Sequence, residues 1–487
     1  MVILQLLTAS SLSLAVTLGP AQTKSGPVKG NRPGSRQALV ATQSINDGTL
    51  ASVRRSDRGA DNKLLRLSAV EHLRRANVYM ANRAFAEARE HWQAVVDNYP
   101  QDPRVSEALL GIGRSYFQSR RYAEAYSTFD QLARDFGATK EGREGLNFSA
   151  ASLLRLGRPG DAVDKYIEYI NRFPNGERID TAYLNVIDTL REAGRAQEAL
   201  SWVGRTRQRF AGTSTESNAL FARLRLEVAE ANWKQAVTTA DELERKSFDK
   251  GVLTTPAEVA YLRAYSLERA GKRREALAGY LAIPDALDSY YGWLAAERLQ
   301  GFRESQSQNL IREKVARTSA KIAAASVSYP APYRQAILKA ARTSKIDPRF
   351  ILALIRQESV FRPLAKSPAG ARGLLQLTID AAQKYASSAG LKELQENDLY
   401  RPETAILIGG EYLAELARMF PDQLEAVAAS YNGGEDNVAR WVKRSKQQDP
   451  GVFTAEIGFE ETKGYVQKVM TNYRAYHELY TADLLRR

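Results

Sequence analysis

The sequence predicts an all-α protein in which a solenoid of helical hairpins precedes a second helical domain. The chain has 487 residues, several times a typical domain length, so two or more folded units with an ample apolar core are expected. A short phrase recurs at a constant interval in the first half, which is typical of stacked helical repeats. In the second half, apolar residues at helical spacing lead to one carboxylic acid, Glu358.

The composition is that of a globular protein, with 44% hydrophobic and 26% charged residues. The lack of cysteine excludes disulfides, thiolate chemistry, Cys-bound zinc and a lipid-modified cysteine. His72, His91 and His477 are scattered without metal-ligand spacing. We therefore expect no metal and no cofactor, and any chemistry rests on carboxylates.

The net charge of +13 and the pI near 9.6 favour an anionic partner. A nucleic acid, a membrane surface and an acidic cell-wall polymer all have the required charge. The sequence contains no clustered basic stripe with interleaved aromatic residues, so we expect no nucleic-acid partner.

The N-terminal segment is apolar and uncharged from Val2 to Leu18, and Gly19 to Ala21 offer a small-residue cleavage pattern. Residues 1–21 are therefore predicted to be a secretory signal removed before Gln22, with retention as an anchor as the alternative. No other stretch approaches the roughly 20 apolar residues of a membrane span, which predicts a periplasmic or envelope protein without a span in the mature chain. Residues 22–64 are rich in Gly, Ser, Pro, Thr and basic residues, which predicts a disordered linker.

The repeat occupies residues 65–300. Phrases that begin at Phe85, Tyr122, Pro159, Ala196 and Trp233 each start 37 residues after the previous one, and each ends on alanine. Aromatic residues recur in the same interval at Tyr99, Phe136, Phe173 and Phe210, where the second helix of each pair would end. A sixth, drifted unit is marked by Arg274 to Ala276. The period predicts a helical-hairpin solenoid that resembles tetratricopeptide repeats with about three extra residues in the turns.

The period does not identify a ligand for the solenoid. One interpretation is a scaffold that holds the domain after it; the other is a concave face that docks glycan strands or an envelope protein partner. Residues 301–328 are polar and form a junction with one expected helix. The final domain is expected at residues 329–487.

Within that domain, a helix is predicted to begin after Asp347, a good N-cap, with Pro348 in its first turn. Its apolar stripe passes through Ile351, Leu354 and Ile355 and then reaches Glu358. An acid at a position where a core side chain is expected loses solvation, and burial raises the pKa of a carboxyl group. Glu358 is therefore a candidate general acid near neutral pH, and the alternative is a solvated glutamate near a helix end.

Three sequence blocks follow in order. Ser359 comes directly after Glu358, and residues 367–377 read S-P-A-G-A-R-G-L-L-Q-L. Residues 430–434 read S-Y-N-G-G, and residues 457–466 read I-G-F-E-E-T-K-G-Y-V. Together they resemble the catalytic domain of soluble lytic transglycosylases, which share a goose-lysozyme-like helical fold. Residues 289–299, S-Y-Y-G-W-L-A-A-E-R-L, resemble the phrase that precedes this domain in the family.

The resemblance implies cleavage of the glycan strands of peptidoglycan, the bacterial cell-wall polymer. In the family, one glutamate protonates the glycosidic oxygen and then acts as a base while the six-position hydroxyl of muramic acid closes an anhydro ring. Glu358 matches that acid, Ser359 and Tyr431 are expected to orient it, and Tyr465 is expected to line the cleft.

The resemblance also implies sugar binding by Gln376 and Glu461. Asn432 is a further candidate for the site, although its position after an apolar helix also suits a helix cap. Glu460 and Glu461 are adjacent, so only one of them is expected to face the cleft.

Two other functions stay open at this point. A muramidase would hydrolyse the same bond and would need a second carboxylate within about 9.5 Å of Glu358, with Asp380 or Glu460 as candidates. A non-enzymatic protein would bind glycan with the last domain and recruit partners through the solenoid.

Overall fold

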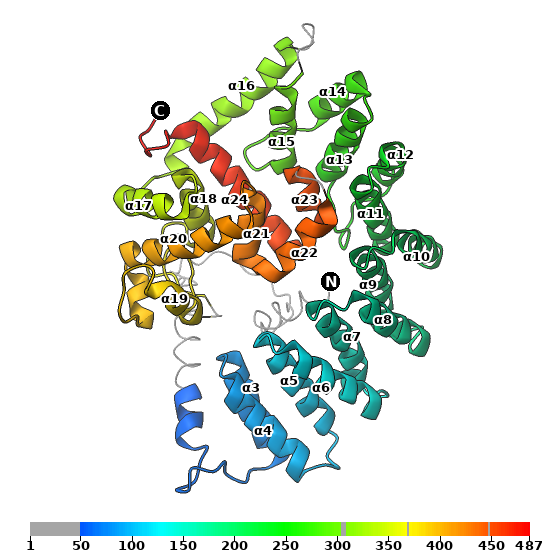
Figure 1. The fold of residues 1–487 in the computed structure, drawn as a ribbon, viewed down its shortest axis with the longest axis vertical. Coiled ribbons are helices and arrows are strands. Elements are labelled where there is room, and N and C mark those ends of the chain that lie inside the picture. The colour runs from blue at the N-terminus through cyan, green and yellow to red at the C-terminus, as the bar shows by residue number, and fades with distance from the viewer. Residues whose placement is uncertain (1–48, 303–307, 368–369, 447–448) are drawn as a thin grey trace, which may run out of the picture. The chain divides into compact units, whose positions relative to one another are not determined.

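The computed structural model describes residues 49–302, 308–367, 370–446 and 449–487. Helices connected by turns make up these ranges, which contain isolated β-bridges and no β-strand, so the prediction of an all-α chain is confirmed for them (Figure 1). The predicted signal segment lies outside the described residues. Two compact units divide the chain, one up to Lys165 and the other from Tyr166 to Arg487. The domain boundaries expected from the sequence stay a prediction.

The first unit consists of antiparallel helices that pack against their neighbours in sequence. Its helices are α3 (Ala69–Ala81), α4 (Phe85–Asn98), α5 (Val105–Gln118), α6 (Tyr122–Asp135) and α7 (Lys140–Arg155). The following helix, α8 (Pro159–Arg172), contains the boundary between the two units.

The predicted repeat marks helix starts. The second helix of each pair begins at Phe85, Tyr122, Pro159, Ala196 and Trp233, the five anchor residues of the 37-residue interval. The alanine that closes each phrase is fully buried in every case: Ala88, Ala125, Ala162, Ala199 and Ala236. A small side chain lets two helix backbones approach closely, so the interval records where neighbouring helices cross.

Residues 49–64 differ from the expected disordered linker. Residues 49–55 are helical, and Asp57 is buried, where it accepts hydrogen bonds from the Arg75 guanidinium at 2.7 Å and from the hydroxyl of Tyr79. A buried carboxylate with two donors fixes the backbone around it, which overrides a composition that otherwise favours disorder.

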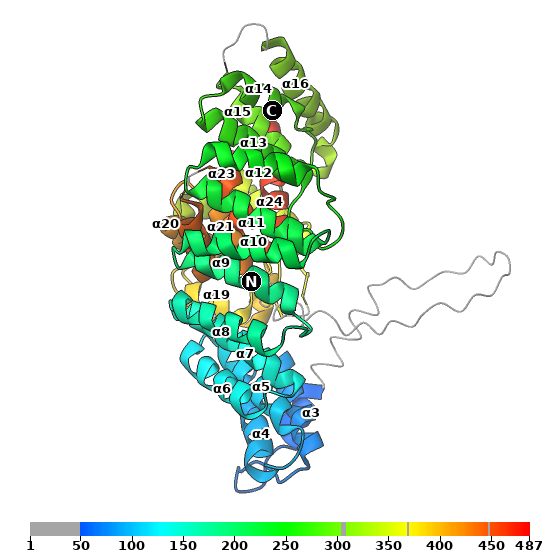
Figure 2. The same cartoon turned by 90° about the vertical axis from the view of Figure 1, so that its right-hand side faces the viewer.

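The second unit begins with the later hairpins. They are α9 (Ile179–Glu192), α10 (Ala196–Arg209), α11 (Ser214–Ala229), α12 (Trp233–Glu244), α13 (Pro256–Arg269) and α14 (Arg273–Ala282). Figure 2 shows α9 to α13 stacked in chain order. The predicted sixth unit corresponds to α14, and its Ala276 is fully buried like the earlier crossing alanines.

Helices α15 (Tyr290–Leu299) and α16 (Gln308–Ala324) lead into the C-terminal helices. These are α17 (Arg334–Ser344), α18 (Pro348–Ser359), α19 (Ile379–Ala386), α20 (Pro402–Met419), α21 (Leu424–Gly433), α22 (Glu435–Ser445), α23 (Pro450–Glu456) and α24 (Glu460–Leu479). The longest of them, α24, packs against both α18 and α21 (Figure 1).

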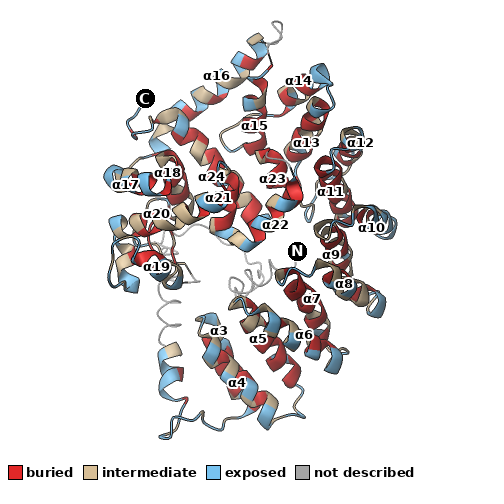
Figure 3. Cartoon of the chain, in the orientation of Figure 1, coloured by how far each residue is buried: buried red, intermediate tan, exposed pale blue. Residues whose placement is uncertain are grey.

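The last hairpins and the C-terminal helices share one core. Val452 and Ala455 of α23 belong to the same buried apolar cluster as side chains of α11, α12 and α13. In α15, the hydroxyl of Tyr290 pairs with Thr454 Oγ1 at 3.0 Å and donates to Glu425 Oε1 at 3.2 Å. Figure 3 shows the buried faces of α11, α13 and α23 in red. The last hairpins therefore share a buried core with the C-terminal helices.

Candidate active site

Helix α18 presents Glu358 at its C-terminal end. The Asp347 side chain accepts a hydrogen bond from the backbone N–H of Arg349 at 2.9 Å, and Pro348 occupies the first turn, as predicted. The apolar side chains between them and Glu358 are fully buried, so the stripe fixes the rotation of the helix. The helix stops at Val360, whose φ of +50° is strained for a β-branched residue. The acid therefore sits on a rigid, abruptly terminated helix.

The carboxyl group of Glu358 is partly buried and receives one hydrogen bond, from the hydroxyl of Tyr465 to Oε1 at 2.6 Å. Burial raises the pKa of Glu358 to about 7, and the hydrogen bond from Tyr465 opposes that rise. Neither cause is another carboxylate. Near neutral pH the group can therefore exist in both its acid and its base form.

Two tyrosines meet near Glu358 from different helices. Tyr465 lies on α24, and Tyr431 lies near the end of α21, which Gly434 stops with a φ of +81°. The hydroxyl of Tyr431 donates to the backbone carbonyl of Leu375 at 2.7 Å. The charge of Glu358 raises the pKa of Tyr431 further, after burial, so the two groups are close. The hydrogen bond to the acid, however, comes from Tyr465, which the sequence placed only in the cleft wall.

An aromatic stack supports Tyr431. Its ring lies 5.2 Å from the ring of Tyr412, and the ring of Tyr412 lies 5.2 Å from that of Tyr385, measured between centroids. Offset aromatic contacts of this kind add to the apolar burial and restrict ring rotation. The hydroxyl of Tyr431 is therefore held on the loop that contains Leu375.

The loop after α18 is fixed by its own side chains. Gln376, with a φ of +47°, donates its amide to the carbonyls of Gly373 at 2.9 Å and Ala365 at 3.1 Å. A Cβ atom on Gly373 would lie 1.9 Å from the carbonyl oxygen of Leu399, so only glycine fits there. Gly373 therefore lets the loop pack against the backbone at Leu399. The hydrogen bonds of the Gln376 amide hold the loop in its conformation.

The remaining predicted residues lie on the adjoining helix ends. Ser359 is buried, and its hydroxyl donates to the carbonyl of Ile355 at 3.1 Å. Asn432 is exposed, and its Oδ1 accepts a hydrogen bond from the hydroxyl of Thr462 at 2.7 Å, which joins α21 to α24. Glu461 is exposed in the first turn of α24.

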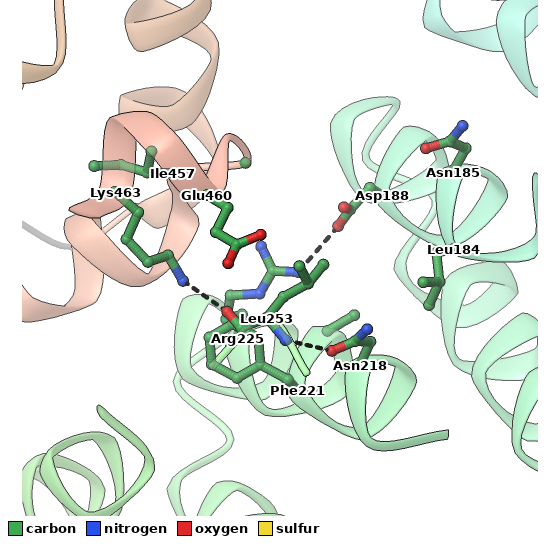
Figure 4. Close-up of a pocket in the computed structure, with 12 residues that line it drawn as sticks. Leu184, Asn185, Asp188, Asn218, Phe221, Arg225, Leu253, Ile457, Glu460 and Lys463 are labelled. Carbon is green, nitrogen blue, oxygen red and sulfur yellow. Dashed lines mark hydrogen bonds and ion pairs between the residues drawn. The ribbon is translucent and has the colours of Figure 1, made fainter. Parts of the chain in front are cut away.

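Glu460 lies at a small cavity beside helices of the solenoid. It lines a small cavity with Asp188 of α9, Arg225 of α11 and Lys463 of α24, and Figure 4 shows its carboxylate directed into that cavity beside Arg225. Within the described part of the chain, no three His, Asp or Glu side chains form a group that could hold a metal ion.

Two charged residues near the N-terminal end of α24, Glu456 and Lys463, were not predicted from the sequence to have a role. Glu456 is clamped by Arg191, Arg225 and Arg444, and Lys463 pairs with Glu258 of α13. Burial is what gives these residues their role, and one sequence does not measure burial. A detectable signal was the eleven-residue spacing of Lys463 and Arg474, which places two cations on one face of a helix.

Comparison with known proteins matches both halves of the chain. Residues 335–453 match the family model described as the transglycosylase SLT domain, and residues 72–102 and 107–138 match tetratricopeptide repeats. The second match confirms the tetratricopeptide-like prediction for those ranges. A soluble lytic murein transglycosylase of Escherichia coli K12 is 33% identical over 159 residues, which cover 32% of this chain and 24% of that protein.

A soluble lytic murein transglycosylase of Salmonella typhimurium is 32% identical over 151 residues, covering 31% of this chain and 23% of the relative. The chain thus spans about a quarter of the length of the curated relatives it matches. Among solved structures, an inactive mutant of the lytic transglycosylase Slt from Pseudomonas aeruginosa has a TM-score of 0.49 and 19% identity, covering 84% of this chain and 72% of that one.

Proposed function

We propose that this chain, which carries a transglycosylase SLT domain over residues 335–453, is a peptidoglycan lytic transglycosylase. It would cleave the β-1,4 bond between N-acetylmuramic acid and N-acetylglucosamine without water and leave a 1,6-anhydro-muramic acid end. The observation that carries the proposal is the partly buried Glu358, whose pKa of about 7 suits both halves of that reaction.

In the first step, neutral Glu358 would donate its proton to the glycosidic oxygen as the bond to the muramic acid C1 breaks. Tyr465 would then stabilise the carboxylate that forms, because its hydroxyl already donates to Oε1 at 2.6 Å. In the second step, the carboxylate takes the proton of the six-position hydroxyl while that oxygen bonds to C1. Glu358 ends the cycle protonated, and no water enters.

The supporting roles follow from the positions of the other residues. Ser359 secures the last turn of α18 through the Ile355 carbonyl, and Tyr431 secures the Leu375 segment, so both would orient the acid indirectly. Glu460 and Glu461 are both exposed, and Glu461 is the one that does not line the cavity beside Arg225, which supports it as the sugar-binding residue.

Gln376 and Asn432 would complete the sugar-binding surface. The Gln376 amide nitrogen is committed to two loop carbonyls, so its carbonyl oxygen is the group that would accept a hydrogen bond from a sugar hydroxyl. Asn432 is exposed between the ends of α21 and α24, where its amide nitrogen would donate to the sugar.

The hydrolase alternative requires a second carboxylate opposite Glu358. Glu460, one of its two candidates, lines the cavity on the side of the solenoid helices. This position favours the lyase over a hydrolase in which Glu460 is the second carboxylate.

The substrate implies an exported protein, and we propose a periplasmic location with peptidoglycan strands as the partner. In the described residues, no helix is both long enough and apolar enough to cross a membrane. An envelope protein partner of the solenoid, predicted from its repeat architecture alone, stays a prediction.

The test is mass spectrometry of the soluble products released from purified cell-wall sacculi by the wild type, by Glu358→Gln and by Glu460→Gln. We expect muropeptides that end in the anhydro sugar, one water lighter than hydrolysis products. Glu358→Gln should lower their yield by about 10²- to 10⁴-fold, the contribution of a general acid. Glu460→Gln, the matched control, should keep them.

Products with reducing ends would instead identify a hydrolase, and loss of activity in Glu460→Gln would identify its second carboxylate. Release of no soluble product by the wild type, together with binding to sacculi, would favour the non-enzymatic scaffold.

A further inference from the structure

Helix α24 makes ion pairs or hydrogen bonds on two opposite faces. Lys463 and Tyr465 are two positions apart, so their side chains leave the helix about 200° apart. Tyr465 donates to Glu358 on α18, and Lys463 donates from Nζ to Oε1 of Glu258 on α13 at 3.0 Å. The same helix turn therefore binds the candidate acid on one side and a solenoid helix on the other.

Glu258 is a buried acceptor on the solenoid helix α13 for the hydrogen bond from Lys463. It has no exposed surface, and it also accepts hydrogen bonds from the hydroxyls of Tyr291 and Thr254, both at 2.8 Å. Lys463 makes a second contact, to the carbonyl of Leu253 at 3.3 Å, which Figure 4 shows reaching from α24 to the segment before α13. Both carboxylate oxygens of Glu258 accept hydrogen bonds, and the ammonium of Lys463 donates to two acceptors, so the position of Lys463 is fixed by several groups.

The two-sided arrangement repeats further along α24. Arg474, three helical turns after Lys463 and hence on the same face, forms two hydrogen bonds to the carboxylate of Asp285, at 2.7 and 3.0 Å. Asn472, two turns after Tyr465 and on its face, accepts a hydrogen bond from Arg356 of α18 at 3.1 Å. The face toward the preceding helices thus carries cations, and the opposite face contacts the helix of the acid.

The segment that leads into α24 is held in the same way. Glu456, almost fully buried, forms ion pairs with Arg191 of α9, with Arg225 of α11 at 3.4 Å and with Arg444 of α22 at 3.4 Å. Two of these three arginines belong to solenoid helices. Buried charges therefore bind the solenoid both to Glu456, just before α24 begins, and to Lys463, in the first turns of α24.

We propose that Glu258 and Lys463 are positioning residues for the active site: through α24, this pair holds the Tyr465 hydroxyl on the carboxyl group of Glu358. A buried ion pair contributes little net stability, because desolvation offsets its attraction, but it tolerates little displacement. Removal of either charge leaves the other buried and uncompensated, and the first turns of α24 move to relieve it. The catalytic consequence rests on the proposed function, whereas the effect on the titration of Glu358 does not.

The experiment measures the ionisation of Glu358 directly in the full chain. A ¹³C NMR titration of protein labelled at the glutamate side-chain carboxyl follows Glu358, whose signal is assigned by its disappearance in Glu358→Gln. The Tyr465 hydrogen bond favours the carboxylate, so its loss raises the pKa. We expect Lys463→Met and Glu258→Gln each to shift the Glu358 transition to higher pH, and Lys463→Arg to restore the wild-type transition.

Lys446→Met is the matched control. Lys446 also joins the C-terminal helices to a solenoid residue, Glu230, at 2.6 Å, but both side chains are largely exposed and neither lies on α24. This variant should leave the transition unchanged. The double variant Lys463→Met, Glu258→Gln should shift it no further than either single one, because the two residues act as a pair.

An unchanged Glu358 transition in both folded single variants would overturn the proposal, as would an equal shift in Lys446→Met. Should Lys463→Met fail to fold, Glu258→Gln decides alone, since it keeps the side-chain volume and one oxygen that accepts the hydrogen bond from Tyr291. A shifted transition in a protein that releases no anhydro products would support the positioning role and refute the proposed function. Where activity is present, kcat is expected to fall about tenfold in both single variants.

Discussion

The hydroxyl group of Tyr465 lowers the pKa of Glu358 below the value that burial alone would give. Burial alone favours the neutral form, and the Tyr465 hydrogen bond at 2.6 Å restores part of the stability of the carboxylate. The proposed reaction uses both forms in one cycle, the neutral form as proton donor and the carboxylate as proton acceptor. The two opposing effects together hold the pKa of Glu358 at about 7, where both forms are populated near neutral pH.

Tyr465→Phe tests this balance. Because the lost hydrogen bond favoured the charged form, the pKa of Glu358 rises above about 7. In the proposed reaction the protonated form of Glu358 starts the cycle, so the alkaline limb of kcat/KM is expected to move to higher pH, while the maximal rate falls about tenfold from poorer orientation of the acid. Measurement of the pH–rate profile on soluble glycan strands checks both effects.

Tyr473→Phe provides the comparison on the same helix, because the hydroxyl of Tyr473 donates to Asp347 at 3.1 Å rather than to Glu358. Its alkaline limb should stay in place. An alkaline limb that moves downward in Tyr465→Phe would contradict the assigned direction of the hydrogen bond.

At this scale, the sequence pointed to Glu358 as the candidate acid, which stays a prediction, and did not identify Tyr465 as the residue that donates a hydrogen bond to it. Glu358 could be singled out because a stripe of apolar residues at helical spacing leads to it. Tyr431 and Tyr465 each lie within one of the sequence blocks. The packing of α24 against α18 and α21 decides which of the two hydroxyls reaches the carboxyl group. That packing is tertiary, so spacing along the chain could not choose between the two tyrosines.

Among the elements, the second helices of the repeats show the closest agreement between pattern and structure. All five phrases coincide with the first residue of a helix, and the aromatic residue about fourteen positions later stands just beyond the end of that helix at Tyr99, Phe136, Phe173 and Phe210. Local periodicity determines these positions. The order of residues 49–64, by contrast, depends on Arg75 and Tyr79, which lie in the next helix and meet Asp57 only after folding.

The crossing alanines should not tolerate a larger side chain. Ala199 of α10 is fully buried, and α10 packs against both α9 and α11. Ala199→Leu is expected to lower the free energy of unfolding by about 1–3 kcal/mol through overpacking. Urea unfolding followed by circular dichroism measures the loss.

Gln197, exposed on the same helix, is the control position. Gln197→Leu adds a similar apolar group without a close neighbour and should change the free energy of unfolding by less than about 0.5 kcal/mol. Equal losses in both variants would show that leucine disturbs α10 for a reason other than helix crossing.

For the whole molecule, the second compact unit joins solenoid helices to the helices of the candidate site. The joint consists of the apolar cluster that contains Val452 and Ala455 and of the buried charges around Glu456 and Lys463. We expect residues 329–487, produced without the solenoid, to lose hydrogen-exchange protection in the backbone of residues 450–466, because Glu456 would keep only one of its three arginines.

Hydrogen exchange followed by mass spectrometry compares this fragment with the full chain. Residues 402–419, in α20, serve as an internal reference, since they pack against α17 within the fragment. Protection of residues 450–466 at the level of the full chain would show that the C-terminal helices do not need the solenoid for their fold.

The constant spacing of the helix starts also bears on how such a chain can change by duplication. A segment of 37 residues inserted or deleted between Phe85 and Pro159 would keep every crossing alanine in phase with its neighbours, because each hairpin repeats the same register. The residues that bind Glu456 and Lys463 all lie after this region of the sequence. The length of the array is therefore open to evolutionary change at its N-terminal end, while its last hairpins are constrained by their contacts with the helix that carries Tyr465.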